Sequence, residues 1–301
     1  MQPSGTPMVT VMMPCYQAAA TLPTALASLR VQTMRDWRCV CVDDGSTDET
    51  WKLLREAAQH DGRFEVHRFP QNRGRGAARQ FLLERVETSL LAFLDADDWM
   101  FPTRLDQQVR RLTREPELAA IGSPMVIFDE DEKAVGLAPA YAPRPGMSSG
   151  TFDVPVPPGL NFPASMIRAD LARRVGFDER FLRSQDSDML LRALLGRRVA
   201  VLDAPVYAYR RAAMTLPKTL DGYRFRIRAH AKHLRDYPSA VAPTIAKTLA
   251  KMLAYRVAGL VGQQDRLMDR RYGAMTREVE QAYRAAHSIV EAGRETAWTK
   301  D

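Results

Sequence analysis

The chain has few of the residues that build disulfide frameworks, and it has no long apolar run. Its three cysteines are an odd number, and Cys39 and Cys41 stand two apart in a β-like run, which predicts small buried side chains rather than disulfides or a zinc site. No run approaches the roughly 20 apolar residues of a membrane-spanning helix. The N-terminal MQPSGTPM has neither a basic stretch nor the apolar core of a signal peptide. We therefore expect a cytoplasmic protein.

Acidic residues are scarce toward the C-terminus. Residues 221–301 hold 15 Lys and Arg against 9 Asp and Glu, so they carry +6 of the net charge of +7. Within Arg224–Arg256, eight basic residues face the single acid Asp236. A basic appendage on a nearly neutral body predicts an anionic partner, and we expect no nucleic acid among its partners.

One apolar stripe in this basic region has two interpretations. Lys247, Lys251 and Arg256 lie off the stripe. In the first interpretation the stripe packs on the rest of the protein and the basic face is solvated. In the second, the helix adsorbs to anionic lipid, which would place the protein at the inner face of the membrane. The stripe consists of Val241, Ile245, Leu249, Leu253, Val257 and Leu260.

The first hundred residues alternate between β-like and helical patterns. Right-handed βαβ units of this kind form a mostly parallel sheet with helices on both faces. We predict a helix over Thr21–Gln32 with three leucines on one face, and Ser46–Glu49 matches a capping box that would open a second helix. That second helix is expected to bury Trp51, Leu54 and Ala58, and a third helix, after the loop QNRGRGAAR, is expected to end near Val86. The expected strands are Met8–Met13, Arg38–Val42, Phe64–Phe69 and Leu90–Leu94.

The pattern loosens after residue 98. Residues 139–163 contain seven prolines, too many for a helix or an interior strand, and we expect this segment and Asn161–Ser165 to shape an acceptor pocket. From Asp221 onward the pattern is helical. The other expected elements are helices near Pro102–Arg114, Ala169–Val175 and Asp186–Leu195, and β-like runs at Ala119–Phe128 and Arg198–Tyr209.

Acidic side chains follow directly after a predicted buried strand. Asp95, Asp97 and Asp98 come immediately after the apolar run Leu90–Leu94. Their charges repel, and a divalent cation is a common remedy, since oxygen ligands suit Mg²⁺ or Mn²⁺ and open positions can take a diphosphate. Ligands of parallel sheets bind beyond the carboxyl ends of the strands. We therefore expect Pro14–Tyr16, Asp43–Ser46 and Asp95–Asp98 to line one crevice.

Five motifs in order resemble the family 2 inverting glycosyltransferases with the GT-A fold. They span roughly residues 8 to 211, and a single one of them would be weak. Together, in the family's order, they are highly specific. The motifs are VTVMMPCYQ, VCVDDGSTDET, NRGRGAARQ, LAFLDADDW and VGFDERFLRSQDSDMLLRAL.

The resemblance implies a nucleotide-sugar site. Asp44, with Asp43 beside it, corresponds to a carboxylate that accepts a hydrogen bond from a pyrimidine ring N–H, which uracil and thymine offer and cytosine does not. Pro14 and Tyr16 correspond to the base-stacking segment, and Arg79 to the cation that faces the diphosphate. The implied donor is a UDP- or dTDP-sugar. Without the resemblance, a helix-entry turn for the acids, core packing for Tyr16 and a solvated helix face for Arg79 would be the favoured explanations.

The resemblance also implies a metal and a base. Asp97 would bind Mg²⁺ or Mn²⁺ directly, and Asp95 would support the ribose or a coordinated water. Asp186 would take the proton from an acceptor hydroxyl as that oxygen attacks the anomeric carbon, which inverts its configuration. The alternative is that Asp186 is an acid favoured at a helix N-terminus. Further candidate contacts to the acceptor or diphosphate are Asp98, Gln185 and Arg210.

Two departures from the family pattern stand out. Gln185 replaces a glutamate, which removes a charge beside Asp186 and one cause of a raised pKa there. Ala212–Met214 supplies no histidine after Tyr209-Arg210-Arg211, so Arg210 or Arg211 would have to neutralise the diphosphate instead.

Three other functions compete with this interpretation. A nucleotidyltransferase also combines such a sheet with acidic metal ligands, but PCYQAAAT after the first strand has neither the glycine nor the positive charge that grips a triphosphate. A dinucleotide oxidoreductase would need a G-x-G-x-x-G there. A binding module without activity, for nucleotide sugar or membrane, would tolerate loss of Asp97 and Asp186.

The sequence thus predicts an α/β fold of GT-A type with a C-terminal helical extension. We divide it into a catalytic domain over 1–220, with a nucleotide-sugar half at 1–98 and an acceptor half at 99–220, and a basic helical extension at 221–301. The expected reaction is metal-dependent, inverting transfer of a sugar to an acceptor hydroxyl in glycan, polysaccharide or glycoconjugate biosynthesis. The acceptor could be a saccharide, a lipid-linked saccharide or a small molecule.

Overall fold

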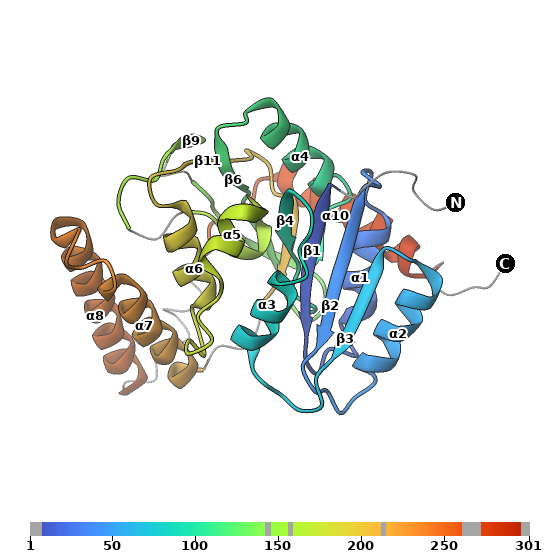
Figure 1. Ribbon diagram of the computed structural model, residues 1–301, viewed down its shortest axis with the longest axis horizontal. Coiled ribbons are helices and arrows are strands. Elements are labelled where there is room, and N and C mark those ends of the chain that lie inside the picture. The colour runs from blue at the N-terminus through green and yellow to red at the C-terminus, as the bar shows by residue number, and fades with distance from the viewer. Residues whose placement is uncertain (1–7, 142–145, 156–158, 212–214, 261–271, 296–301) are drawn as a thin grey trace.

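Two β-sheets form the framework of the computed structural model, which describes residues 8–141, 146–155, 159–211, 215–260 and 272–295 (Figure 1). The larger sheet has eight strands in the order β3-β2-β1-β4-β10-β6-β11-β9. These strands are β1 (Val9–Cys15), β2 (Trp37–Asp43), β3 (Phe64–Arg68), β4 (Leu90–Phe93), β6 (Leu118–Gly122), β9 (Ser149–Thr151), β10 (Met166–Arg168) and β11 (Arg198–Val201). The smaller sheet has the order β5-β12-β7-β8, with β5 (Trp99–Met100), β7 (Met125–Phe128), β8 (Ala134–Ala138) and β12 (Tyr207–Arg210).

Helices cover the larger sheet and extend the molecule at one end. The helix pair α7 and α8 lies at the opposite end of the molecule from α2 (Figure 1). The helices are α1 (Leu22–Arg30), α2 (Thr50–His60), α3 (Arg75–Leu83), α4 (Arg104–Arg114), α5 (Ala169–Val175), α6 (Gln185–Leu194), α7 (Leu216–Ala231), α8 (Pro238–Leu260) and α10 (Arg277–Glu295), with a short 3-10 turn η1 (Phe162–Ala164). In the described ranges, no helix has the length and apolar character to span a membrane.

The N-terminal half confirms the predicted βαβ pattern. Strands β3, β2, β1 and β4 are neighbours and run parallel. Leu22, Leu26 and Leu29 are buried along one face of α1, as their spacing predicts. The capping box is wrong, because α2 begins at Thr50 and has no side-chain cap. The Ser46 Oγ instead accepts a hydrogen bond from the backbone N–H of Gln17 at 2.9 Å, so this segment ties down the loop after β1.

Two β-like runs each divide between the two sheets. Ala119–Phe128 was expected as one strand, but it forms β6 and β7 with Ser123 and Pro124 between them. Arg198–Tyr209 likewise divides into β11 and β12, with Pro205 in the break. Proline cannot donate to a sheet ladder, so it marks the points where the chain leaves one sheet for the other.

The C-terminal helix α10 packs against the N-terminal half. It contacts α1 and contributes Tyr283, Ala286 and Val290 to a core shared with Trp99 and Phe101. Aromatic rings dominate this core, with Trp99 stacked on Phe101 at 5.2 Å between ring centres. The last described helix is therefore bound to the smaller sheet rather than free.

Helices α7 and α8 form a pair beside α6. The apolar stripe of α8 that was expected to pack on the protein faces solvent instead over most of its length. Helix α8 packs on α7, and α7 packs on α6. Of the predicted stripe, Val241 is buried, but Leu249, Leu253, Val257 and Leu260 are exposed. The interpretation in which this stripe packs inward is therefore wrong for the C-terminal part of the helix.

Candidate active site

Three strand ends meet at one edge of the larger sheet. Cys15, the last residue of β1, pairs with Asp43, and Met12 pairs with Phe93 of β4. The backbone N–H of Asp44 donates to the carbonyl of Cys15 at 2.8 Å. The segments after β1, β2 and β4 therefore leave the sheet side by side, as parallel neighbours must.

Asp43 and Gly45 shape the turn after β2. The buried Asp43 accepts a hydrogen bond from the Ser46 N–H at 2.9 Å through Oδ1, and its Oδ2 lies 3.1 Å from Nε of Arg68 in an ion pair without hydrogen-bond geometry. Gly45 has φ +72°, and a Cβ there would lie 2.5 Å from the backbone carbon of Gln71. Glycine thus lets this turn touch the loop before α3.

Asp44 holds that same loop. Its two carboxylate oxygens accept the backbone N–H of Arg73 at 2.6 Å and of Gly74 at 2.9 Å. Burial raises the pKa of Asp44, and the negative charge of Asp43 adds to this, while the two N–H donors act in the opposite direction. Near it, Tyr16 is 51% exposed and Pro14 is half-buried, so the Tyr16 ring is available to a planar ligand.

The acidic turn after β4 brings ligand oxygens of Asp95, Asp97 and Asp98 within 4.8 Å of one another. Asp98 is buried and accepts hydrogen bonds from the Tyr207 hydroxyl and the Arg210 N–H, both at 2.8 Å. Burial raises the pKa of Asp98 well above its usual range, and its acidic neighbours raise it further. Both oxygens of Asp98 are thus engaged in fixing the turn to β12.

Asp97 is the exposed member of this turn. Partial desolvation raises its pKa, and so does repulsion from Asp95. Its carboxylate forms no ion pair within the described part of the chain. Closely spaced oxygens with raised pKa values suit a hard divalent cation, because its charge would stabilise the ionised forms that now repel. The donor set therefore fits Mg²⁺ or Mn²⁺, with Asp97 and Asp95 as the available ligands.

Two arginines from α3 face the acids. Arg79 is almost fully buried, and its guanidinium lies 3.1 Å from Asp95 and 4.0 Å from Asp186. Burial alone would lower the pKa of Arg75, but the carboxylates of Asp95 and Asp186 outweigh it, so that pKa is raised. These cations link the acid that follows β4 to the acid that begins α6.

A cavity of about 310 Å³ opens at this junction. Asp95, Asp186, Arg75 and Arg79 line it together with Arg226, which comes from α7. Phe162 and Leu160 form part of its apolar wall. Of the predicted site residues, the cavity thus brings together Arg79, Asp95 and Asp186. Tyr16, Asp44 and Asp97 do not line it, although Asp97 is two residues from Asp95 on the same turn.

The first turn of α6 separates two acids with different surroundings. Asp186 keeps a third of its side chain exposed, whereas Asp188 is buried and pairs with Arg192 at 2.7 Å and Lys232 at 2.6 Å. Asp188 therefore ties α6 to the end of α7. Gln185 is also buried. Ser184, just before the helix, has the left-handed φ of +57°, which sets the direction from which Asp186 enters the cavity.

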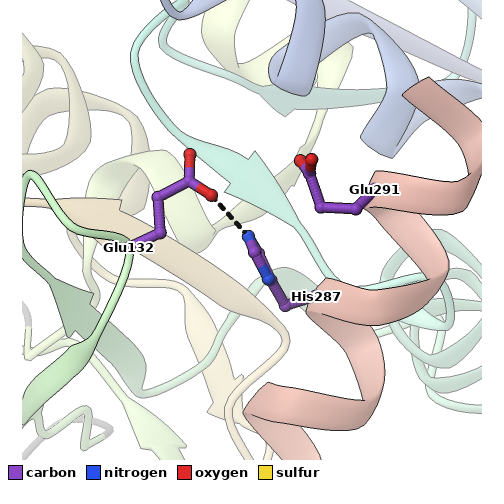
Figure 2. Close-up of side chains that lie close together, drawn as sticks. All are labelled: Glu132, His287 and Glu291. Atoms are coloured by element: carbon purple, nitrogen blue, oxygen red, sulfur yellow. Dashed lines mark hydrogen bonds and ion pairs between the residues drawn. The ribbon is translucent and has the colours of Figure 1, made fainter. Parts of the chain in front are cut away.

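Arg210 joins the acidic turn to α10. Its Nε donates to the carbonyl of Asp97 at 3.1 Å, and its Nη2 lies 3.6 Å from Glu132. Glu132 in turn lies 2.9 Å from Nε2 of His287, and Figure 2 shows Glu291 one helical turn further along α10 on the same side. Arg210 thus supports the turn through its backbone, and its guanidinium is already engaged by the Asp97 carbonyl and Glu132.

Sequence reasoning did not single out three residues that the structure places here. Arg75 stands within the NRGRGAARQ motif, whose two arginines could have suggested it. Tyr207 gave no signal, because its contact with Asp98 crosses 109 positions. Arg226 was only one basic residue among many in its region. The segment in which the family's histidine is absent, residues 212–214, lies outside the described residues.

Comparison with known proteins finds relatives that include two described as glycosyltransferases. The Putative glycosyltransferase EpsE of Bacillus subtilis (strain 168) is 30% identical over 148 residues, which are 48% of this chain and 53% of EpsE. The matched segment thus spans about half the length of that relative. "Putative glycosyltransferase EpsH" of the same organism is 36% identical over 114 residues, covering 38% of this chain and 33% of EpsH.

Solved structures share the fold over nearly the whole chain. S. aureus TarS 1-349 in complex with UDP has a TM-score of 0.63 at 18% identity, covering 96% of this chain and 90% of that chain. The mannosyltransferase PcManGT from Pyrobaculum calidifontis, in complex with GDP-Man and Mn²⁺, has a TM-score of 0.59 at 19% identity, covering 99% and 89%. These likenesses confirm the predicted GT-A type of fold. Residues 10–167, more than half of the chain, match the family described as Glycosyl transferase family 2, and the chain belongs to that family.

Proposed function

We propose that the protein is an inverting, metal-dependent glycosyltransferase that moves a sugar from a UDP- or dTDP-sugar to an acceptor hydroxyl, in glycan, polysaccharide or glycoconjugate biosynthesis. The observation that carries this proposal is the shared cavity of Asp95, Arg79 and Asp186, which lies beside the acidic turn at the ends of parallel strands. One acid there can serve a metal and diphosphate, and the other can serve an acceptor.

The donor would lie across the strand ends. The base would stack near Pro14 and the exposed Tyr16, with its ring N–H toward Asp44, whose neighbour Asp43 holds the turn. Each oxygen of Asp44 already accepts one backbone N–H and retains a second lone pair. The nucleotide complexes of the two structural relatives, one with UDP and one with GDP-Man and Mn²⁺, support a nucleotide here.

Asp97 and Asp95 would hold Mg²⁺ or Mn²⁺. When bound, that cation would neutralise negative charge on the leaving nucleoside diphosphate. Arg75 and Arg79 contribute fixed positive charge in the cavity beside Asp95, and Arg210 holds the turn by donating to the Asp97 carbonyl. Asp98, buried and hydrogen-bonded on both oxygens, would act as a positioning residue for the turn rather than as a contact to the acceptor.

Asp186 would act as the base. Its carboxylate reaches the cavity from the first turn of α6, where it can accept the proton of a bound hydroxyl as that oxygen attacks the anomeric carbon. Attack from the face opposite the leaving diphosphate inverts the carbon in a single displacement. Gln185 is buried behind it and would shape its position. The acceptor side would come from the proposed acceptor half at 99–220 and from Arg226 of the extension.

The test is a donor screen with two variants. Purified protein is incubated with UDP- and dTDP-sugars, Mn²⁺ or Mg²⁺ and a set of candidate acceptors, and nucleoside diphosphate release and donor binding are both measured. Asp186→Asn should bind donor normally and lose nearly all turnover, whereas Asp97→Asn should lose metal-dependent donor binding as well. NMR of the product anomer tests inversion. Absence of binding to every donor, or unchanged turnover in Asp186→Asn, would contradict the proposal.

Release of inorganic diphosphate from a nucleoside triphosphate in the same assays would instead favour the nucleotidyltransferase alternative. The loop after β1 does not favour that alternative. The backbone N–H groups of Gln17, Ala18 and Ala19 in this loop already donate to side chains of the segment after β2, namely those of Ser46, Thr50 and Asp48. A triphosphate would have to displace these bonds.

A further inference from the structure

Helix α8 presents an apolar stripe to solvent. Leu249, Leu253, Val257 and Leu260 are 52%, 63%, 52% and 88% exposed. Their spacing of four, four and three residues places them on one side of the helix. They are four of the eleven exposed large apolar side chains in the described part of the chain, and the other seven are dispersed over other elements. A concentration of this kind marks an interaction surface rather than scattered surface residues.

The opposite side of α8 already does the packing. Its buried residues include Thr248, Met252, Tyr255 and Ala258. The Tyr255 ring lies 5.9 Å from that of Tyr223 in α7, and the Thr248 hydroxyl donates to the Thr244 carbonyl at 2.8 Å. Because this side of α8 makes the contact with α7, the exposed apolar stripe is not needed to hold the helix in place.

Charge selects the partner of this stripe. Helix α8 contains no acidic residue over its 23 positions, and Lys247 and Arg256 are exposed on it. Pairing two copies of the chain through α8 would bring these cations toward one another without an acid of that helix to compensate them. An apolar stripe on a helix whose charged residues are all cations fits the surface of a bilayer with anionic headgroups.

We propose that α8 lies flat on an anionic lipid bilayer, with the Leu249–Leu260 stripe inserted among the acyl chains and the flanking cations at the headgroups. The helix is roughly 35 Å long at 1.5 Å per residue, which is enough for a stable in-plane contact. This surface is separate from the strand ends that we propose to bind the donor, and the binding itself does not depend on the activity.

The position of α8 gives the contact a role. Helix α7 lies between α8 and α6 (Figure 1), and Arg226 of α7 lines the cavity of Asp186. A bilayer at α8 would thus meet the proposed acceptor side of the molecule, not the proposed base-binding side at the ends of β1 and β2. If the proposed transferase activity holds, this arrangement favours an acceptor that is anchored in lipid, with its hydroxyl presented at the membrane surface.

The test measures vesicle flotation of the full chain, without nucleotide sugar. Vesicles of phosphatidylcholine alone are compared with vesicles containing about 30% phosphatidylglycerol, at low salt and at about 0.5 M NaCl, where screening leaves little long-range attraction. We expect flotation with the anionic vesicles only, and a reduction at high salt. The double variant Leu253→Gln with Val257→Gln should lower the partition coefficient about tenfold or more, since both side chains leave the acyl region.

Matched controls separate this surface from general stickiness and from activity. Ile289→Gln removes an apolar side chain that is 50% exposed on α10 and should float like the wild type. Asp97→Asn should float normally while losing turnover, so loss of activity and loss of binding are distinguishable. Equal flotation with neutral vesicles, unchanged flotation of the double variant, or a dimer in sedimentation that the double variant abolishes would overturn the proposal.

Discussion

Two clusters among the residues that the structure describes have the composition of a metal site, yet their surroundings differ. Asp95, Asp97 and Asp98 lie after β4, and Glu132, His287 and Glu291 lie between the β7–β8 turn and α10 (Figure 2). In each, three potential ligand atoms lie within 4.8 Å of one another. The second cluster also borders the larger cavity, of about 710 Å³ against about 310 Å³ beside the first. Geometry and cavity size alone would favour the second.

The balance of charge reverses that preference. In the second cluster, Glu132 lies between His287 and Arg210, and Glu291 lies 3.3 Å from Arg294. Those acids already have cationic partners, and a metal would have to displace them. In the first cluster, Asp95 pairs with Arg79, but Asp97 has no ion pair in the described part of the chain, and burial and repulsion from Asp95 raise its pKa. The unpaired carboxylate of Asp97, rather than ligand spacing, distinguishes the proposed catalytic site.

Removing one carboxylate from each cluster tests this distinction with the largest expected effect. Asp97→Asn should lower metal-dependent turnover by about 100-fold or more, because it removes the exposed metal ligand. Glu291→Gln should leave turnover within about twofold. Steady-state rates at saturating Mn²⁺, with Mn²⁺ affinity from electron paramagnetic resonance, would check both. A larger loss in Glu291→Gln than in Asp97→Asn would reverse the assignment of the two clusters.

The pH dependence of metal binding sharpens the comparison. A cation favours the ionised form of Asp97, so affinity should be full above the raised pKa of that carboxyl and fall as pH drops through it, by about tenfold per unit for one proton. Titrations of Mn²⁺ at successively lower pH, over the range in which the protein stays folded, should show this fall in the wild type and in Glu291→Gln alike. If the affinity rises as pH falls, Asp97 is not the ligand.

Which parts of this site were predictable depends on how local the information is. The positions of Asp44, Asp95 and Asp186 follow from strand ends and a helix start, because parallel strands deliver their carboxyl ends to one edge. The role of Asp98 was not predictable, since Tyr207 and Arg210, which engage both its oxygens, come from a strand of the second sheet. That sheet was itself missed, because β7 and β12 had each been merged with a strand of the larger sheet, β5 is only two residues long, and β8 had not been predicted.

Helix α8 shows the same limit in another form. The sequence pattern located its apolar stripe correctly, but periodicity states which residues share a side and not which side faces the protein. The buried side includes Thr248 and Tyr255, whose polar atoms would argue for exposure. A hydrogen bond within the helix satisfies Thr248, so its burial costs little, and only the position of α7 decides the orientation.

Tyr207 holds Asp98, and through it the turn of the first cluster, in place. Removing its hydroxyl should have an effect of intermediate size. Burial, together with the charges of Asp98 and Asp95, raises the pKa of Tyr207 well above its usual range, so its hydroxyl stays a donor. Tyr207→Phe removes the bond to Asp98 and one accepted from the Asp95 N–H, and should cost about 1–3 kcal/mol of stability. Urea unfolding measures this cost.

A matched tyrosine separates stability from function. Tyr283→Phe removes a 2.8 Å hydrogen bond to the Glu132 carbonyl beside the second cluster, and it should also destabilise the fold. Only Tyr207→Phe, however, should weaken Mn²⁺ binding, since only Tyr207 holds the turn of Asp97. Equal metal affinity in the two variants would show that Asp98 does not position that turn.

The smallest expected effect concerns the link between the two clusters. Glu132 lies 3.6 Å from Arg210, and Arg210 donates to the Asp97 carbonyl, so α10 reaches the acidic turn through a single arginine. Glu132→Gln should leave Arg210 in place, because the guanidinium still stacks over Phe128 at 4.7 Å, but with its charge less restrained. We expect Mn²⁺ affinity to change by about twofold to fivefold, as for a partly exposed ion pair.

Glu291→Gln, which removes an equal charge from the same cluster without touching Arg210, should show no change. If both glutamate variants behave alike, the effect is one of net charge, and the second cluster serves only to hold α10 against the smaller sheet.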